Sequence, residues 1–128
     1  MSFDIFLQGF VGGGGAPGDR AAAIAIVTPL LADPVSDGFG RIVTADGEAD
    51  IYGLGDNDQG LMINHANGRQ IWQLIVDVAR AAGYAVLPVG CPVCVVDEVM
   101  IAHLPDELRQ DAVLVHDGGD LECAVVNA

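Results

Sequence analysis

Residues 64–96, NHANGRQIWQLIVDVARAAGYAVLPVGCPVCVV, decide the fold because they join an amphipathic helix directly to an apolar run. In the helical part, apolar residues recur at spacings of three and four on one face, and polar residues lie opposite. Asn67 is predicted to cap the start of this helix and Gly83 to end it. The apolar run at 84–87 then favours a buried strand, so we expect the core to lie here. The helix face expected to be buried consists of Ile71, Leu74, Ile75, Val78 and Ala82.

The segment before this unit contains shorter patterns. Alternation at 3–11 predicts a strand. The four glycines at 12–15 lack the spacing of a nucleotide-binding loop and favour a flexible connector. A helix is predicted to begin near Pro17 and to break near Thr28, because Pro29 follows it.

The chain from Ile42 to Ile51 is predicted to form a hairpin, because Asp46-Gly47 is a type I′ turn pair. A two-residue turn at this point pairs Thr44 with Ala49. It also pairs Ile42 with Ile51 on the same apolar face, which should be buried. The other face is mixed and carries exposed carboxylates.

The remaining pattern completes an α+β architecture. Strands are predicted at 61–65 and 112–116, and helical turns at 98–103 and 105–110. The end of the chain from Asp117 is either a helix or a hairpin, and the pattern slightly favours the helix. We expect residues 1–128 to form a single α+β domain, with a mixed sheet and helices packed mainly on one face.

Composition excludes several classes of protein. The formal net charge is −13, from 18 acidic residues against five arginines and no lysine, which argues against direct binding of nucleic acid. Apolar runs are interrupted well before the roughly 20 residues of a membrane span, so no membrane association is predicted. The N-terminus has Asp4 and no basic region, which argues against a signal peptide. The three cysteines are an odd number, and a reducing cytoplasm is the expected location.

The acidic residues fall in two segments that flank the central unit. Residues 33–58 hold seven acids and one arginine, and residues 97–122 hold eight acids and one arginine. Between them, residues 59–96 hold only one acid, Asp77. Coding bias or adaptation to salt would explain the total, and two solvated edges would explain the distribution.

The functional interpretation of this acidity is a docking surface for a basic protein partner. Acid-rich surfaces steer basic partners into collision and raise their association rates. We place the surface on the hairpin and the loop that follows it. The predicted partner-binding residues are Asp46, Glu48, Asp50, Asp56 and Asp58. No catalytic residue and no cofactor is predicted, and the sequence leaves the oligomeric state open.

Cysteine chemistry is the alternative. Cys91-Pro92-Val93-Cys94 has the spacing of thiol–disulfide enzymes, but these need a helix after the first cysteine, and Val95-Val96 favours a strand. A zinc site could use Cys91, Cys94 and Cys123 with His103 or His116, although only half of that set has recognisable spacing.

Other catalytic and metal-binding motifs are missing or incomplete. The segment Asp56-Asn57-Asp58 fails the spacing of an EF-hand, because Gly60 stands where a third ligand is needed. The sequence has no HExxH or GxSxG, so an enzyme is not favoured. Trp72 lies beside the apolar face of the central helix and is expected to be half exposed at the edge of the core.

Three segments resemble a family of small bacterial proteins. They are SFDIFLQ at 2–8, RQIWQLIVDVARAAGYAVLP at 69–88 and VVDEVMIAHLP at 95–105. The resemblance covers most of the chain but includes no catalytic motif. Similar small acidic proteins are often immunity partners of secreted toxins, so the resemblance implies a protein that neutralises a basic bacterial toxin.

Overall fold

The computed structural model describes residues 3–55 and 60–126. Its elements in chain order, with η for a 3-10 helix, are β1 (Ile5–Val11), β2 (Gly14–Ala16), α1 (Arg20–Val27), η1 (Thr28–Leu30), β3 (Gly40–Val43), β4 (Glu48–Tyr52), β5 (Leu61–Asn67), α2 (Arg69–Ala82), β6 (Tyr84–Pro88), β7 (Cys94–Val95), η2 (Glu98–His103), α3 (Asp106–Arg109), β8 (Val113–Leu114) and α4 (Gly118–Val126).

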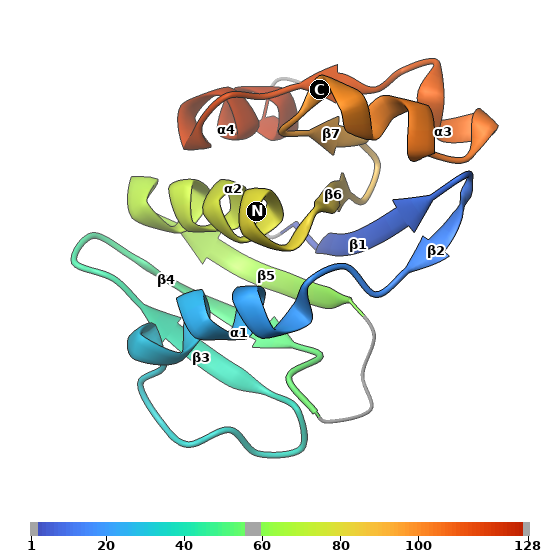
Figure 1. Ribbon diagram of the computed structural model, residues 1–128. Coiled ribbons are helices and arrows are strands. Elements are labelled where there is room, and N and C mark those ends of the chain that lie inside the picture. The colour runs from blue at the N-terminus through green and yellow to red at the C-terminus, as the bar shows by residue number, and fades with distance from the viewer. Residues whose placement is uncertain (1–2, 56–59, 127–128) are drawn as a thin grey trace.

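The strands of the described residues form one eight-stranded sheet (Figure 1). Seven of them follow the order β3-β4-β5-β1-β6-β7-β8, and β2 pairs with the end of β1. All pairs are antiparallel except β7 with β8, which is parallel. The mixed sheet with separate helices confirms the predicted α+β fold.

Helices cover the two faces of the sheet unequally. The large core lies on one face, where α1, α2 and α4 pack against β1, β3, β4, β5 and β6. A smaller core lies on the other face, where η2 and α3 cover only the end formed by β6 and β7. The predicted packing mainly on one face is therefore confirmed. Among the described residues, no helix covers the second face over β3, β4 and β5.

Helix α2 has the predicted buried face and the predicted end, where Gly83 adopts the left-handed conformation, but it begins one residue later than a cap at Asn67 implies. Its buried surface is wider than predicted, because α1 packs against one side and α4 against the other. Trp72 is 5% exposed, so the expectation of a half-exposed side chain is wrong. The first residue of α4 explains this. Gly118 lies so close to α2 that a Cβ atom on it would be 2.4 Å from the backbone nitrogen of Gln73.

The start of α2 is capped from another element. Gly68 occupies the N-cap position without a side-chain hydrogen bond, so the predicted cap by Asn67 is wrong. The carboxylate of Asp46, in the turn between β3 and β4, accepts hydrogen bonds from the backbone N–H groups of Arg69 at 2.9 Å and Gln70 at 3.2 Å. These are N–H groups that an isolated helix leaves without partners.

The hairpin of β3 and β4 has a different register from the predicted one. Ile42 pairs with Ala49 rather than with Ile51, and the loop therefore has four residues instead of two. Thr44 stabilises the longer loop, since its backbone N–H and its hydroxyl both donate to the carbonyl of Gly47. The shift is two residues, so each side chain keeps its predicted face, and Ile42, Ala49 and Ile51 are buried as expected.

The glycine run at 12–15 is not a flexible connector. Gly12 and Gly13 have φ values of 59° and 87°, and they form the turn between β1 and β2. The C-terminal end of η2 holds this turn, because the carbonyl of His103 accepts from the Gly13 N–H at 3.0 Å.

The C-terminal helices follow the prediction, but the buried strand predicted at 112–116 is reduced to the short, incompletely buried β8. Helical turns occupy 98–103 and 106–109, and the segment after Asp117 is the helix α4, as the pattern favoured. No helix within the described ranges combines the length and the apolar character needed to cross a bilayer.

Candidate functional site on the open face of the sheet

The sheet has an open face where no described helix lies over it. We define the open face as the outward side chains of β1, β3, β4 and β5 together with Phe39, the residue just before β3. Its large hydrophobic members are exposed together on one face: Phe6 by 45%, Val43 by 43%, Tyr52 by 38% and Phe39 by 36%. Phe10 points to the same side of β1 but packs into the small core.

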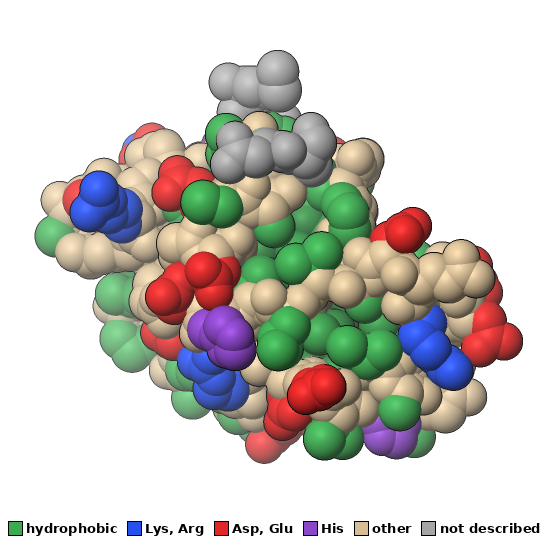
Figure 2. Space-filling view, turned by 90° about the horizontal axis from the view of Figure 1, so that it is seen from above, with side chains coloured by type: hydrophobic (Ala, Val, Ile, Leu, Met, Phe, Trp, Pro, Cys, Tyr) green, Lys and Arg blue, Asp and Glu red, His purple; other side chains and the backbone are tan. Residues whose placement is uncertain are grey.

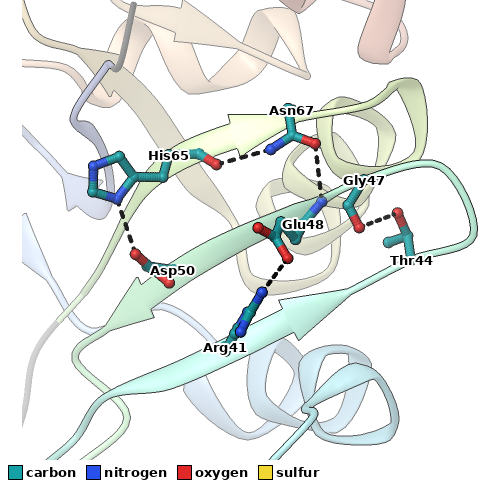
Figure 3. Close-up of polar contacts among 7 residues, drawn as sticks. All are labelled: Arg41, Thr44, Gly47, Glu48, Asp50, His65 and Asn67. Atoms are coloured by element: carbon teal, nitrogen blue, oxygen red, sulfur yellow. Dashed lines mark hydrogen bonds and ion pairs between the residues drawn. The ribbon is translucent and has the colours of Figure 1, made fainter.

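Two polar side-chain pairs, one of them an ion pair, join neighbouring strands of the open face (Figure 3). The guanidinium of Arg41 on β3 donates to the carboxylate of Glu48 on β4. On the neighbouring strand, Nδ1 of His65 lies 2.9 Å from Oδ2 of Asp50. The pKa of Arg41 is raised, chiefly by the hydrogen bond to Glu48 and by the charge of that carboxylate. Both pairs are at least partly exposed to solvent, so each contributes little to the stability of the fold.

An irregularity in the sheet brings the second pair together. The register of β4 against β5 shifts between Glu48 and Asp50, and His65 has a φ of 52°, a conformation that residues other than glycine rarely adopt. Asn67 supports the shift, since its side-chain oxygen accepts from the backbone N–H of Glu48 at 3.3 Å. A strained backbone held by hydrogen bonds is more common at functional sites than elsewhere.

An aromatic pair borders these charges. The rings of Phe39 and Tyr52 lie with centroids 5.0 Å apart and planes tilted by 56°, a favourable arrangement for two aromatic side chains. Beside them is an open hollow of about 530 Å³. Its lining residues are Asp33, Phe39, Arg41, Glu48, Ala49, Asp50 and His65. Apolar and acidic groups therefore meet in one place.

The structure separates the predicted partner-binding residues. Glu48 and Asp50 lie together on the open face and line the hollow. Asp46 has a structural role, because both of its carboxylate oxygens accept hydrogen bonds from the start of α2. Asp56 and Asp58 lie outside the described residues, as does the calcium motif considered for 56–58.

The sequence indicated only part of the surroundings of Glu48 and Asp50. The alternation of the hairpin predicts Arg41 and Tyr52 on the same face as Asp50, and the structure confirms this. Asp33 and Phe39 reach the hollow only through the course of the loop between η1 and β3, which has no periodic pattern. The positive φ of His65 has no signature in the sequence.

The cysteines do not form the arrangement that thiol enzymes use. Cys94 begins the strand β7 rather than a helix, so no helix N-terminus lowers the pKa of a thiol here. Burial, and then the neighbouring Cys91, raise the pKa of Cys94 to about 11. The thiol of Cys91 instead contacts the backbone carbonyl of Val125 at 3.7 Å.

The possible zinc ligands are distributed over separate surfaces. Cys123 is exposed on α4, and Cys94 is buried. His103 contacts the turn between β1 and β2, where its Nδ1 accepts from Gly12. Within 3–55 and 60–126, no three Cys, His, Asp or Glu side chains come together in a group able to hold a metal ion.

Acidic side chains are also present far from the open face. Figure 2 looks onto the side formed by the C-terminal elements, and it shows hydrophobic side chains at the centre with acidic, basic and histidine side chains around them. The second acidic segment, 97–122, belongs to these elements. Charge alone therefore does not distinguish the open face, but the combination of acids with exposed aromatic rings does.

Comparison of the chain with protein-family models, with curated proteins and with solved structures gave no match. The resemblance to small bacterial proteins stays a prediction, and the functional conclusions rest on the geometry of the open face.

Proposed function

We propose that this chain is a non-catalytic binding protein that captures a basic protein partner on its open face. The observation that carries the proposal is that Phe6, Phe39 and Tyr52 are exposed on the same face as Glu48 and Asp50, and that Phe39 lines one hollow with both carboxylates. Protein interfaces typically combine aromatic residues at the centre with polar residues around them. The net charge of −13 favours partners of positive charge and speeds their approach.

Binding is a better interpretation of this surface than catalysis. The pair of Asp50 and His65 resembles the oriented base of a hydrolase, but such a base needs a nucleophile within hydrogen-bond reach. The described residues that line the hollow include no serine, threonine or cysteine.

The biological class that we propose is an immunity protein, which neutralises a basic bacterial toxin by covering it. Immunity proteins must associate quickly with a partner that is lethal when free, and a negatively charged surface provides this speed. We propose a reducing cytoplasm as its location, and the three cysteines, all free thiols, support this assignment.

Selection of random peptides displayed on phage, with the immobilised protein as target, tests the proposed surface. The recovered peptides should be rich in arginine or lysine together with apolar residues. The double variant Glu48→Lys/Asp50→Lys should bind them at least tenfold more weakly. The control Glu107→Lys/Asp111→Lys changes the net charge equally at exposed sites outside the open face and should keep binding within about twofold. Recovery of peptides without net positive charge, or equal loss in both variants, would refute the proposal.

The immunity class has a separate test. Where a basic secreted protein is encoded next to this gene, that protein should stop growth when it is expressed alone in a bacterial host. Co-expression with the wild-type chain should restore growth, and co-expression with Glu48→Lys/Asp50→Lys should not. A toxic neighbour that the wild-type chain fails to neutralise would contradict immunity while leaving the binding surface itself in place.

A further inference from the structure

The charges around Arg41 are not balanced. Arg41 is the one arginine among the described residues that line the hollow. Three carboxylates, those of Asp33, Glu48 and Asp50, line it as well. Glu48 is hydrogen-bonded to Arg41, and Asp50 is paired with His65. Asp33 is exposed and acts on Arg41 through its charge, without a side-chain hydrogen bond or ion pair to another described residue. The hollow thus has at its edge a carboxylate that no hydrogen bond holds and that a cation from outside can reach.

The exposed rings favour one kind of cation. Phe39 lines the same hollow as Asp33, and its neighbour Tyr52 keeps it in place. A guanidinium is planar and weakly hydrated, so it stacks on an aromatic face while it donates to a carboxylate. A lysine ammonium is compact and strongly hydrated, and it gains less from this combination.

We infer that the hollow on the open face receives an arginine side chain of the basic partner, which stacks on Phe39 and donates to Asp33, and that Arg41 competes with it for the same carboxylates. This inference rests on the proposed function and names the chemistry of the contact. Arg41 already shows the interaction in intramolecular form, because it lies on the open face with its guanidinium on Glu48. A partner arginine adds a second guanidinium where three carboxylates face only one.

A small probe tests the contact without a partner protein. N-acetyl-L-arginine amide is titrated into the ¹⁵N-labelled protein and compared with N-acetyl-L-lysine amide at the same ionic strength. The arginine probe should shift the backbone amides of Asp33, Phe39 and Tyr52 and should bind several-fold more tightly than the lysine probe. Equal affinity of the two probes, or shifts spread over the acidic segment 97–122 as well, would overturn the inference.

Three variants test which residues take part in binding the arginine probe. Asp33→Asn should weaken the arginine probe about twofold to fivefold, which is the effect of an exposed charge pair. Asp37→Asn is the matched control, since Asp37 is exposed on the same loop but does not line the hollow, and it should change little. Arg41→Gln should tighten binding by a similar factor, because it releases the carboxylates that Arg41 holds. Weaker probe binding by Arg41→Gln would show that Arg41 does not compete.

These outcomes are independent of the peptide selection. If basic peptides are recovered and lose binding in Glu48→Lys/Asp50→Lys while the arginine probe shows no preference, the open face binds partners but has no arginine pocket. If the peptides are not basic, the proposed function fails whatever the probe does.

Discussion

The carboxylate of Asp46 caps a helix that begins 23 residues later, with Oδ2 accepting from the backbone N–H of Arg69 at 2.9 Å. The hairpin that carries the open face is thereby fixed to the start of the central helix. We expect Asp46→Ala to lower the free energy of unfolding by about 1–2 kcal/mol, the usual loss when a helix cap is removed. Thermal and urea unfolding would measure it. Asp111→Ala, at an exposed acid outside the hairpin, is the control and should change the free energy by less than about 0.5 kcal/mol.

The contact of α4 with α2 depends on the absence of a side chain at position 118. In Gly118→Ala, the new Cβ would lie 2.4 Å from the backbone nitrogen of Gln73, so α4 must move away from Trp72. The free energy of unfolding should fall by about 2 kcal/mol or more, as in other overpacked cores. The tryptophan fluorescence should shift to the red. Gly119→Ala has only the end of the Asp117 side chain within 3.3 Å and should leave stability nearly unchanged. Equal effects of the two substitutions would show that the close packing is not specific to Gly118.

Arg20 joins the two ends of the loop that follows β4. Its guanidinium donates to the carbonyls of Gly53, of Gly55 at 2.8 Å and of Gly60 at 3.3 Å. Arg20→Gln should lower stability by about 1–3 kcal/mol, since hydrogen bonds from a charged group are lost. Amide hydrogen exchange should speed up at Leu54 and Leu61. Arg20→Lys keeps the charge but not the planar group, and it should recover little of the loss. Full recovery in Arg20→Lys would mean that charge, rather than the geometry of the bonds, holds the loop.

The two kinds of cysteine environment predict opposite reactivities. The pKa of Cys94 is raised to about 11, so its thiol stays protonated at neutral pH and should resist iodoacetamide in the folded protein. Cys123 is exposed and should be alkylated first, which mass spectrometry of peptides would show. Rapid alkylation of Cys94 at pH 7 would revive the thiol–disulfide alternative.

The same raised pKa has a consequence for stability. The fold favours the protonated thiol of Cys94, so this contribution is complete below the ordinary pKa of 9.0 and is lost as the pH rises through about 11. The unfolding free energy of the wild type relative to Cys94→Ala should therefore fall between these values. Urea unfolding of both proteins at pH 8 and pH 10.5 measures the difference, and a constant difference would contradict the burial of this thiol.

Periodic patterns predicted the frame of this fold. The spacing in α2 and the alternation in β1, β4 and β5 were sufficient to place these elements, because one buried face imposes a strict period on each of them. The hairpin kept its buried face even though its register was wrong. Contacts between distant segments were not predictable from a local pattern. Asp46 and Gly118 both act on α2 from elsewhere in the chain, and their roles changed the cap of the helix and the burial of Trp72.

In the candidate site, too, local patterns predicted some residues, whereas contacts between separate segments were not predictable. The alternation of the hairpin placed Glu48 and Asp50 on the outward face, and both line the hollow. Their partners Arg41 and His65 come from the neighbouring strands, and the strand pairing alone brings them into contact. Phe39 and Asp33 come from an irregular loop. A pattern in the sequence therefore indicated the acids and Tyr52, whereas Phe39 and Asp33 needed the structure.

The most direct test of the docking surface is the association rate of a selected basic peptide, measured by stopped-flow fluorescence at low and moderate ionic strength. Steering by Glu48 and Asp50 predicts that Glu48→Lys/Asp50→Lys associates at least tenfold more slowly at low salt, and that added salt reduces this difference. Glu107→Lys/Asp111→Lys should associate nearly as fast as the wild type. Equal slowing in both double variants would mean that the total charge of the protein, and not its open face, attracts the partner.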